Sequence, residues 1–168
     1  MSVILEHVSK AYGRQKALDD IGFRLEEGEI CGFLGPNGAG KSTMMNLISD
    51  NLTPSKGRVL LDGRGIDELG SEYRKLLGYM PQQQGFYEDF SPKAFLKYMA
   101  EIKGVKKIKT TDENGNEVVK TVNQQIDELL EVVNLTKVAY KKIGGFSGGM
   151  KQRVLLAQAL LGNPKILI

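Results

Sequence analysis

The first part of the chain alternates apolar and polar residues in the way that is typical of β-strands. Residues 3–12 (VILEHVSKAY) predict one strand, and residues 21–35 (IGFRLEEGEICGFLG) predict two more, broken at Glu27-Gly28. Residues 58–63 (RVLLDG) predict another strand that closes in a turn. The chain therefore has a β-rich beginning.

Later segments carry the apolar spacing of helices. In residues 123–135 (NQQIDELLEVVNL), Ile126, Leu129, Leu130 and Val133 fall on one helical face. A β-rich start followed by alternating elements predicts an α/β protein with an antiparallel piece beside a mostly parallel sheet. Further helices are expected within residues 41–49, 66–77 (interrupted at Gly70), 91–104 and 151–163, and short strands within 77–85 and 165–168.

Cap and turn residues sharpen two of these elements. Ser91 is a typical N-cap, Pro92 suits the first helical position and Gly104 is a typical helix end. The polar stretch 105–122 then places Asn114-Gly115 between two β-prone arms, which predicts a small hairpin or a mobile loop inserted on the surface.

A glycine-rich loop, LGPNGAGKST, lies between an apolar stretch that predicts a strand and the first expected helix, and it fits G-x-x-x-x-G-K-[ST] in full. Glycines let the backbone adopt conformations that other residues avoid and approach a ligand closely. Successive backbone N–H groups then point into one concavity that suits phosphate oxygens, and the helix dipole directs its positive end at the same place. The loop residues expected to bind phosphate are Gly35, Asn37, Gly38, Ala39 and Gly40.

Three side chains at the end of the loop are expected to complete a nucleotide site. Lys41 should reach the β- and γ-phosphates, the Ser42 hydroxyl should ligate Mg²⁺, and Thr43 is placed to contact the α-phosphate. The alternative is a glycine-rich turn without a ligand, which the predicted strand before the loop and the helix after it disfavour.

Two further residues are weaker candidates for the same site. Tyr12 lies shortly before the second strand, where its ring could stack on adenine, although a tyrosine at a strand end often only packs. Gln82 lies where a strand gives way to a loop, and its amide could bind Mg²⁺ or a water near a γ-phosphate. Glutamines also occupy the next two positions, as is common in polar loops.

A second glycine motif, GFSGGMKQR, opens the helix expected at residues 151–163. Ser147, Gly148 and Gly149 provide free N–H groups, a hydroxyl and a positive dipole end, which together suit an anion. The alternative is a serine-capped helix with flexible glycines. One nucleotide does not need two separate phosphate cradles, but a dimer that holds nucleotide between the loop of one copy and this helix start of the other does.

Composition excludes several classes of protein. The 168 residues suffice for one ordinary domain. A net charge of +3, from 23 basic and 20 acidic residues, is too small to indicate a nucleic-acid partner, and the lysine-rich stretch 103–109 is interpreted as a solvated helix end and loop.

Cysteine usage and hydropathy indicate the compartment. Cys31 is the only cysteine, which fits a reducing compartment, and its apolar surroundings predict a small buried side chain. No apolar stretch approaches the roughly 20 residues that span a bilayer, and the start does not look like a signal peptide. A cytoplasmic protein is expected, with any membrane part supplied by a partner.

On these motifs the chain resembles the nucleotide-binding subunit of an ABC transporter. Tyr12 matches the adenine-stacking aromatic residue, residues 35–43 the Walker A loop, Gln82 the Q-loop glutamine and residues 146–150 the signature motif, usually written LSGGQ. Here the signature reads FSGGM, so an apolar anchor is kept and Ser-Gly-Gly is intact. The resemblance covers essentially the whole chain except the inserted residues 110–119.

The resemblance implies a P-loop NTPase fold of the ABC type, with an antiparallel β subdomain and a helical subdomain. Residues 1–85 would form the β-rich subdomain and Walker A core. Residues 86–150 would form the helical subdomain with its surface insertion at about 105–122, and residues 150–168 the signature helix and the start of the Walker B strand.

The resemblance also implies partners. Two subunits would close head to tail, as a homo- or heterodimer, on two ATP molecules, with Ser147 and Gly149 touching the γ-phosphate held by Lys41 of the opposing copy. The segment after Gln82 would face a membrane permease, and so place the protein at the inner face of the cell membrane. Closing would drive transport, with export as the expected direction, and hydrolysis would reopen the dimer.

Family members continue with LDEP, whose aspartate holds Mg²⁺ and whose glutamate is the general base. Neither residue is in this sequence, and His7 cannot replace the later family histidine, so a C-terminally incomplete chain is expected. Lys41 and Gln82 would remain as catalytic residues, but hydrolysis should be very slow. The strand predicted at residues 29–35 would also lose a neighbour. Two alternatives stay open: a nucleotide-binding module without turnover, and a soluble ABC-type ATPase without a transporter.

Overall fold

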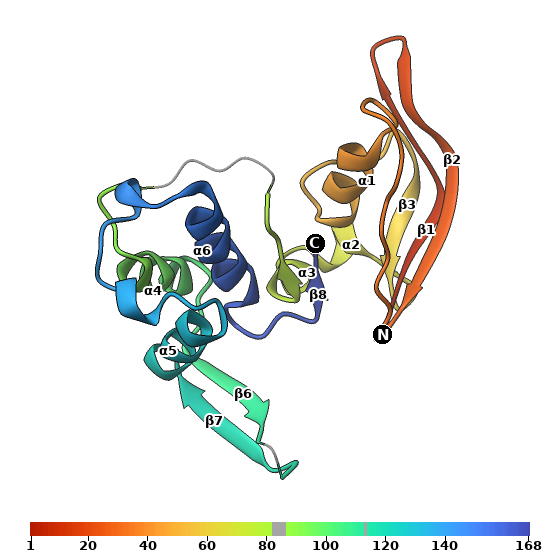
Figure 1. Cartoon of the computed structure of the whole chain (residues 1–168). Helices are drawn as coiled ribbons and strands as arrows, with labels where there is room; N and C mark the ends of the chain where they lie inside the picture. The colour runs from red at the N-terminus through yellow and green to blue at the C-terminus, as the bar shows by residue number, and fades with distance from the viewer. Residues whose placement is uncertain (82–86, 113) are drawn as a thin grey trace. The chain divides into compact units, whose positions relative to one another are not determined.

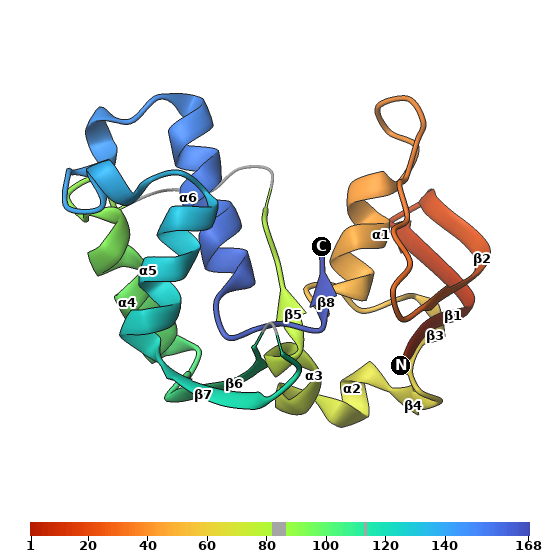
Figure 2. The same ribbon diagram turned by 60° about the horizontal axis from the view of Figure 1, so that its bottom comes forward.

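The computed structural model describes residues 1–81, 87–112 and 114–168, and Figures 1 and 2 show its elements. The chain divides into two compact units, Met1–Lys75 and Leu76–Ile168. The three-part division expected from the sequence stays a prediction. Within the described residues, no helix is long and apolar enough to cross a bilayer.

The first unit is built on a four-stranded antiparallel sheet in which β1 is paired on both sides. Val3 lies opposite Leu25 on one neighbour and Leu61 on the other, and Leu5 is placed in the same way two residues later. These apolar positions share one face, since side chains alternate between the faces of a sheet. On it Val3, Leu5 and Leu61 are buried and Leu25 is half-buried. In sheet order the strands are β2 (Gln15–Glu26), β1 (Ser2–Tyr12), β3 (Lys56–Leu61) and β4 (Arg64–Gly65).

The helices of the first unit follow the sequence closely. The helix after the glycine-rich loop buries Met44, Leu47 and Ile48, and the expected interruption at Gly70 separates two short helices. Both predictions are therefore confirmed. The elements are α1 (Lys41–Ile48), α2 (Ile66–Leu69) and α3 (Ser71–Lys75).

Two side chains tie α3 to the end of α1. The fully buried Tyr73 donates its hydroxyl to the Ile48 carbonyl at 2.6 Å, and Arg74 contacts the Asp50 carboxylate at 2.6 Å. Burial, and secondarily the charge of Asp50, raise the pKa of Tyr73 far above its usual value, so the hydroxyl keeps its proton. Tyr73 thereby satisfies a carbonyl that the helix end leaves without an intrahelical donor.

The strand predicted at residues 29–35 is wrong. This segment has no regular secondary structure, and Ile30 and Leu34 are 101% and 97% exposed. Cys31, expected to be buried, is exposed as well. A strand exists only if a neighbour pairs with its backbone groups, and no strand among the described residues does so.

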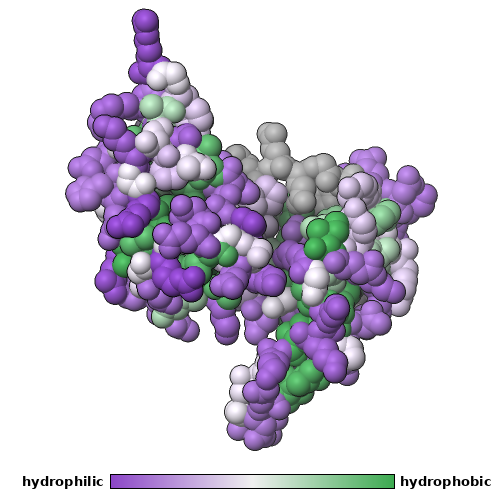
Figure 3. All heavy atoms as spheres, turned by 180° about the vertical axis from the view of Figure 1, so that it is seen from behind, coloured by the Kyte–Doolittle hydropathy of each residue, from purple (hydrophilic) through white to green (hydrophobic). Residues whose placement is uncertain are grey.

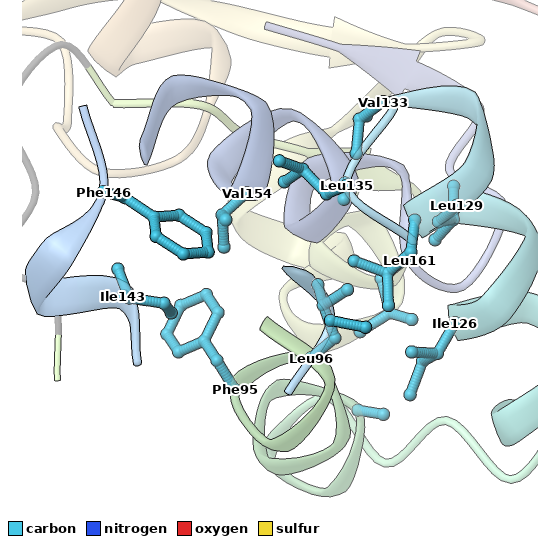
Figure 4. Packing of buried hydrophobic residues seen from close by; sticks show 14 residues of the cluster. Phe95, Leu96, Ile126, Leu129, Val133, Leu135, Ile143, Phe146, Val154 and Leu161 are labelled. Carbon is cyan, nitrogen blue, oxygen red and sulfur yellow. The ribbon is translucent and has the colours of Figure 1, made fainter. Parts of the chain in front are cut away.

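The second unit packs three helices around one apolar core. In Figure 4, Phe95 and Leu96 come from the first helix, Ile126 from the second and Val154 from the third. This confirms the helical face expected in residues 123–135. The helices are α4 (Pro92–Ile102), α5 (Val122–Val132) and α6 (Gly148–Leu160), with 3₁₀ turns at Thr136–Val138 and Ile143–Gly145.

Side chains cap α4 and α5 at their starts. Ser91 accepts the Ala94 N–H at 3.3 Å, as the sequence predicts. Thr121 and Gln124 form a reciprocal capping box on α5, in which each side chain accepts the other residue's backbone N–H. This Thr-x-x-Gln signal places the helix start at Val122, one residue before the predicted segment 123–135.

The inserted segment forms the hairpin that was one of its two expected conformations. Strands β6 (Lys107–Thr111) and β7 (Glu117–Thr121) pair antiparallel, and Figure 3 shows hydrophilic side chains gathered at the outer end. The Asp112 carboxylate accepts the backbone N–H and the side-chain amide of Asn116, and also the backbone N–H of Asn114. These bonds, chiefly those from Asn116, lower the pKa of Asp112. The turn is thus held by its own residues.

A short parallel pair completes the second unit. Strands β5 (Leu77–Gly78) and β8 (Ile166–Leu167) lie within the two segments where strands were predicted. Gly78 packs directly on α6, because a Cβ there would lie 2.4 Å from the Ala159 carbonyl oxygen. Any larger residue would force the strand off the helix.

Hydrogen exchange provides a first test of the fold. We expect the amides of residues 30–34 to exchange at nearly unprotected rates, because no described residue accepts a hydrogen bond from them. The amide of Leu60 in β3, which lies opposite Ile4 of β1, should be protected and serve as the internal reference. Strong protection at 30–34 would show that the segment pairs as a strand.

A second prediction concerns the hydroxyl of Tyr73. Tyr73→Phe keeps the buried ring but leaves the Ile48 carbonyl without its donor, so we expect a loss of about 1–2 kcal/mol in the free energy of unfolding. Tyr140→Phe, at an exposed tyrosine, should change it by less than about 0.5 kcal/mol. Urea unfolding measures both, and equal effects would contradict the assigned role.

Candidate functional site

Helix α1 begins at the glycine-rich loop without a side-chain cap. Its N-cap, Gly40, has φ 87° and ψ 3°, a left-handed conformation that favours glycine. A Cβ at this position would lie 2.7 Å from the Ala17 carbonyl oxygen and 2.8 Å from Leu18 Cδ2. The missing side chain therefore lets the helix start lie directly against β2.

The backbone N–H groups of the first helical turn stay available. The first bond runs from the Met44 N–H to the Gly40 carbonyl at 2.8 Å, and the N–H groups of Lys41, Ser42 and Thr43 have no acceptor among the described residues. No acidic side chain lies in this turn. Such a helix start attracts an anion, since its N–H groups and dipole both present positive charge.

Lys41 adds a full positive charge at the same place. Its Nζ donates to the carbonyl oxygens of Gly35 and Pro36, both at 2.7 Å, so the side chain lies back across the loop. The Ser42 hydroxyl is exposed and Thr43 is half-buried. The cation, the free N–H groups and the exposed hydroxyl fit a triphosphate with its Mg²⁺.

Tyr12 lies at the end of β1 in the same unit and is 53% exposed. The Lys10 Nζ lies 5.6 Å from the centroid of its ring, and Lys10 pairs across the sheet with Leu18, the residue that contacts Gly40. Lys10 is not among the site residues predicted from the sequence. Its spacing of two residues from Tyr12 was the available signal, because residues i and i+2 of a strand share a face.

The predicted Gln82, with Gln83 and Gln84 beside it, lies outside the described residues. His7, the only histidine, is exposed, and its Nδ1 contacts the Asp20 carboxylate at 2.8 Å.

The second glycine motif opens α6 at the surface. Ser147 caps the helix by accepting the Met150 N–H at 3.3 Å, and Ser147, Gly148 and Gly149 are all exposed. Phe146 turns inward and is buried in the core of its unit, while Met150 packs against that core. The two departures from the usual signature thus anchor the motif, and the Ser-Gly-Gly stretch faces solvent.

Comparisons with known proteins agree with these features. A family profile described as "ABC transporter" matches residues 18–168. The chain is 38% identical over 165 residues to the uncharacterized ABC transporter ATP-binding protein YxlF of Bacillus subtilis (strain 168), covering 98% of this chain and 50% of that protein. It is 34% identical over 170 residues to the bacitracin transport ATP-binding protein BcrA of Bacillus licheniformis, covering 100% of this chain and 51% of that protein.

The fold is also that of solved relatives. A structure of an ATP-binding subunit of an ABC transporter superposes with a TM-score of 0.80 at 26% identity, covering 99% of this chain and 65% of that one. The chain spans about half the length of the curated relatives it matches. Its P-loop NTPase fold, mixed α/β content and small antiparallel sheet confirm the expected fold class. The mostly parallel sheet expected beside the antiparallel one is not formed by the described residues, in which β5 and β8 make the one parallel pair. The chain therefore belongs to the ABC transporter ATP-binding family.

Proposed function

We propose that this chain binds ATP with Mg²⁺ and serves as the ATP-binding subunit of an ABC transporter that exports its substrate. The observation that carries the proposal is the uncapped start of α1, with its free N–H groups beside Lys41. The similarity to a bacitracin transport protein supports the transport role. When bound, ATP supplies the free energy for a change in how the subunits associate.

Each residue of the α1 site has a distinct proposed role. The backbone of residues 35–40 surrounds the phosphates, and Lys41 exchanges its two carbonyl acceptors for the β- and γ-phosphate oxygens. Ser42 ligates Mg²⁺, while Thr43 contacts the α-phosphate. Tyr12 stacks on adenine. Lys41 and Gln82 are the residues proposed to contribute to hydrolysis.

The α6 start is proposed to complete the site of a second copy. Two subunits would associate head to tail, so that Ser147 and Gly149 of one bind the γ-phosphate held by Lys41 of the other. The exposure of the whole Ser-Gly-Gly stretch supports this, because the surface is free to meet a partner. A Cβ at Gly148 or Gly149 would meet nothing within 4 Å, so this exposed start leaves room for a ligand.

An aromatic cluster supports docking to a membrane permease. Tyr87, Phe90 and Tyr98 lie with ring centroids 5.3–5.7 Å apart, and Tyr87 is 55% exposed although it is large and largely apolar. Contacting aromatic rings at a surface are typical of protein interfaces. The cluster follows Gln82 along the chain, on the segment expected to face the permease, which would place the protein at the inner face of the cell membrane.

Two other functions remain as alternatives. The chain could bind nucleotide or a longer partner without turnover, or it could belong to a soluble ABC-type ATPase that has no transporter. Co-purification with a membrane subunit, measured together with phosphate release, separates all three.

Substitution of Lys41 tests the nucleotide site. Lys41→Ala removes the cation that faces the phosphates, and we expect ATP·Mg²⁺ to bind roughly 10- to 100-fold more weakly, as for the loss of one charge-assisted hydrogen bond. Isothermal titration calorimetry measures the change. Lys56→Ala, an exposed lysine on β3, is the matched control, and equal affinities for the two variants would refute the site.

Substitution of Gly149 tests the head-to-tail dimer. Gly149→Glu puts a negative charge where the γ-phosphate of the opposing copy should lie, while open space around this position and the helix dipole leave the monomer stable. We expect ATP-dependent dimerisation to be lost and monomer binding of ATP to persist. Gly149→Gln separates charge from size. Light scattering measures the dimer. If Gly149→Glu dimerises as well as the wild type, the α6 start is not the dimer interface.

A further inference from the structure

We propose that Lys10 is a positioning residue for the ring of Tyr12 in the nucleotide site. The inference rests on the proposed function, since it assumes that adenine stacks on Tyr12. Nothing in the nucleotide-binding motifs assigns a role to Lys10, and its ammonium lies over the ring of Tyr12.

Lys10 bridges the aromatic ring and the segment that follows α1. Its Nζ lies 5.6 Å from the centroid of Tyr12, within the range of a cation–π contact. The same Nζ donates to the Thr53 carbonyl at 2.6 Å. The ammonium is therefore held between the Thr53 carbonyl and the Tyr12 ring. It occupies one side of the ring, while Tyr12 as a whole remains 53% exposed.

Backbone contacts on either side of Lys10 make this bridge rigid. Ser9 accepts the Ser55 N–H at 2.8 Å, and the Ala11 N–H donates to the Ser55 hydroxyl at 3.1 Å. Together with Lys10, three consecutive residues of β1 thus bind the 53–55 segment. A ring fixed by such a tether loses less freedom when a base stacks on it.

The register of the sheet connects Lys10 to the phosphate-binding loop. Lys10 lies opposite Leu18, and Leu18 Cδ2 is one of the atoms that would meet a Cβ at Gly40. Lys10, Tyr12 and Leu18 therefore share the face of the sheet on which α1 begins. A cation held on one side of the ring leaves the other side for a base on this face.

If Lys10 positions the ring, its loss should weaken binding of the adenine base and leave binding of the phosphates unchanged. Lys10→Met should raise the Kd for ATP·Mg²⁺ about three-fold, the size of an exposed cation–π contact, and leave the Kd for tripolyphosphate·Mg²⁺ unchanged. Lys10→Arg should retain wild-type affinity, since it keeps the cation. In a Tyr12→Leu background, Lys10→Met should cause no further loss.

Lys16→Met is the control for lost positive charge, because Lys16 is exposed on β2 and pairs with Asp19. It should change both Kd values equally or not at all. If Tyr12→Leu leaves ATP binding unchanged, adenine stacking itself fails, and the inference with it. Two results would overturn only the role of Lys10, provided that Tyr12→Leu does weaken ATP binding. In the first, Lys10→Met leaves ATP binding unchanged. In the second, Lys10→Met weakens the binding of ATP and of tripolyphosphate equally.

Discussion

The proposed nucleotide site depends on one close contact, the approach of Gly40 to the Ala17 carbonyl and the Leu18 side chain. No side chain at position 40 fits against these two groups, so the backbone of the helix start lies directly on β2. That position determines where the free N–H groups of the first turn point and where Lys41 and Ser42 begin. The contact also continues through Leu18 to Lys10, and so relates the phosphate-binding loop to the ring of Tyr12.

The four longer helices begin in physically different ways. Ser91 and Thr121 cap α4 and α5, and each accepts one backbone N–H of its helix's first turn. Helix α1 has no such cap. Helix α6 has the same kind of serine cap as α4, but two exposed glycines follow Ser147 where Pro92 follows Ser91. Among these four helices, α1 is the one without a side-chain cap, and α6 is the one whose first turn begins with exposed glycines.

Much of this could be predicted from the sequence, because it is encoded locally. The hairpin turn at Asn114–Gly115, the Ser91 cap and the break at Gly70 all follow from residues a few positions apart. The strand at residues 29–35 was not predictable in this way. Apolar alternation is a property of one segment, whereas a strand forms only when a second segment pairs with it. No described strand pairs with residues 29–35, and Ile30 and Cys31 are both exposed. The role of Lys10 was likewise hidden, because it depends on the distant Thr53.

The hairpin between α4 and α5 also bears on how such a chain changes during evolution. Lys107 and Thr121 lie opposite each other at its base, and Thr121 is itself the cap of α5. The two ends of the hairpin are therefore adjacent. An insertion built like this adds or removes length without moving the ends of the helices it separates, so lineages can vary this surface while the helical core keeps its packing.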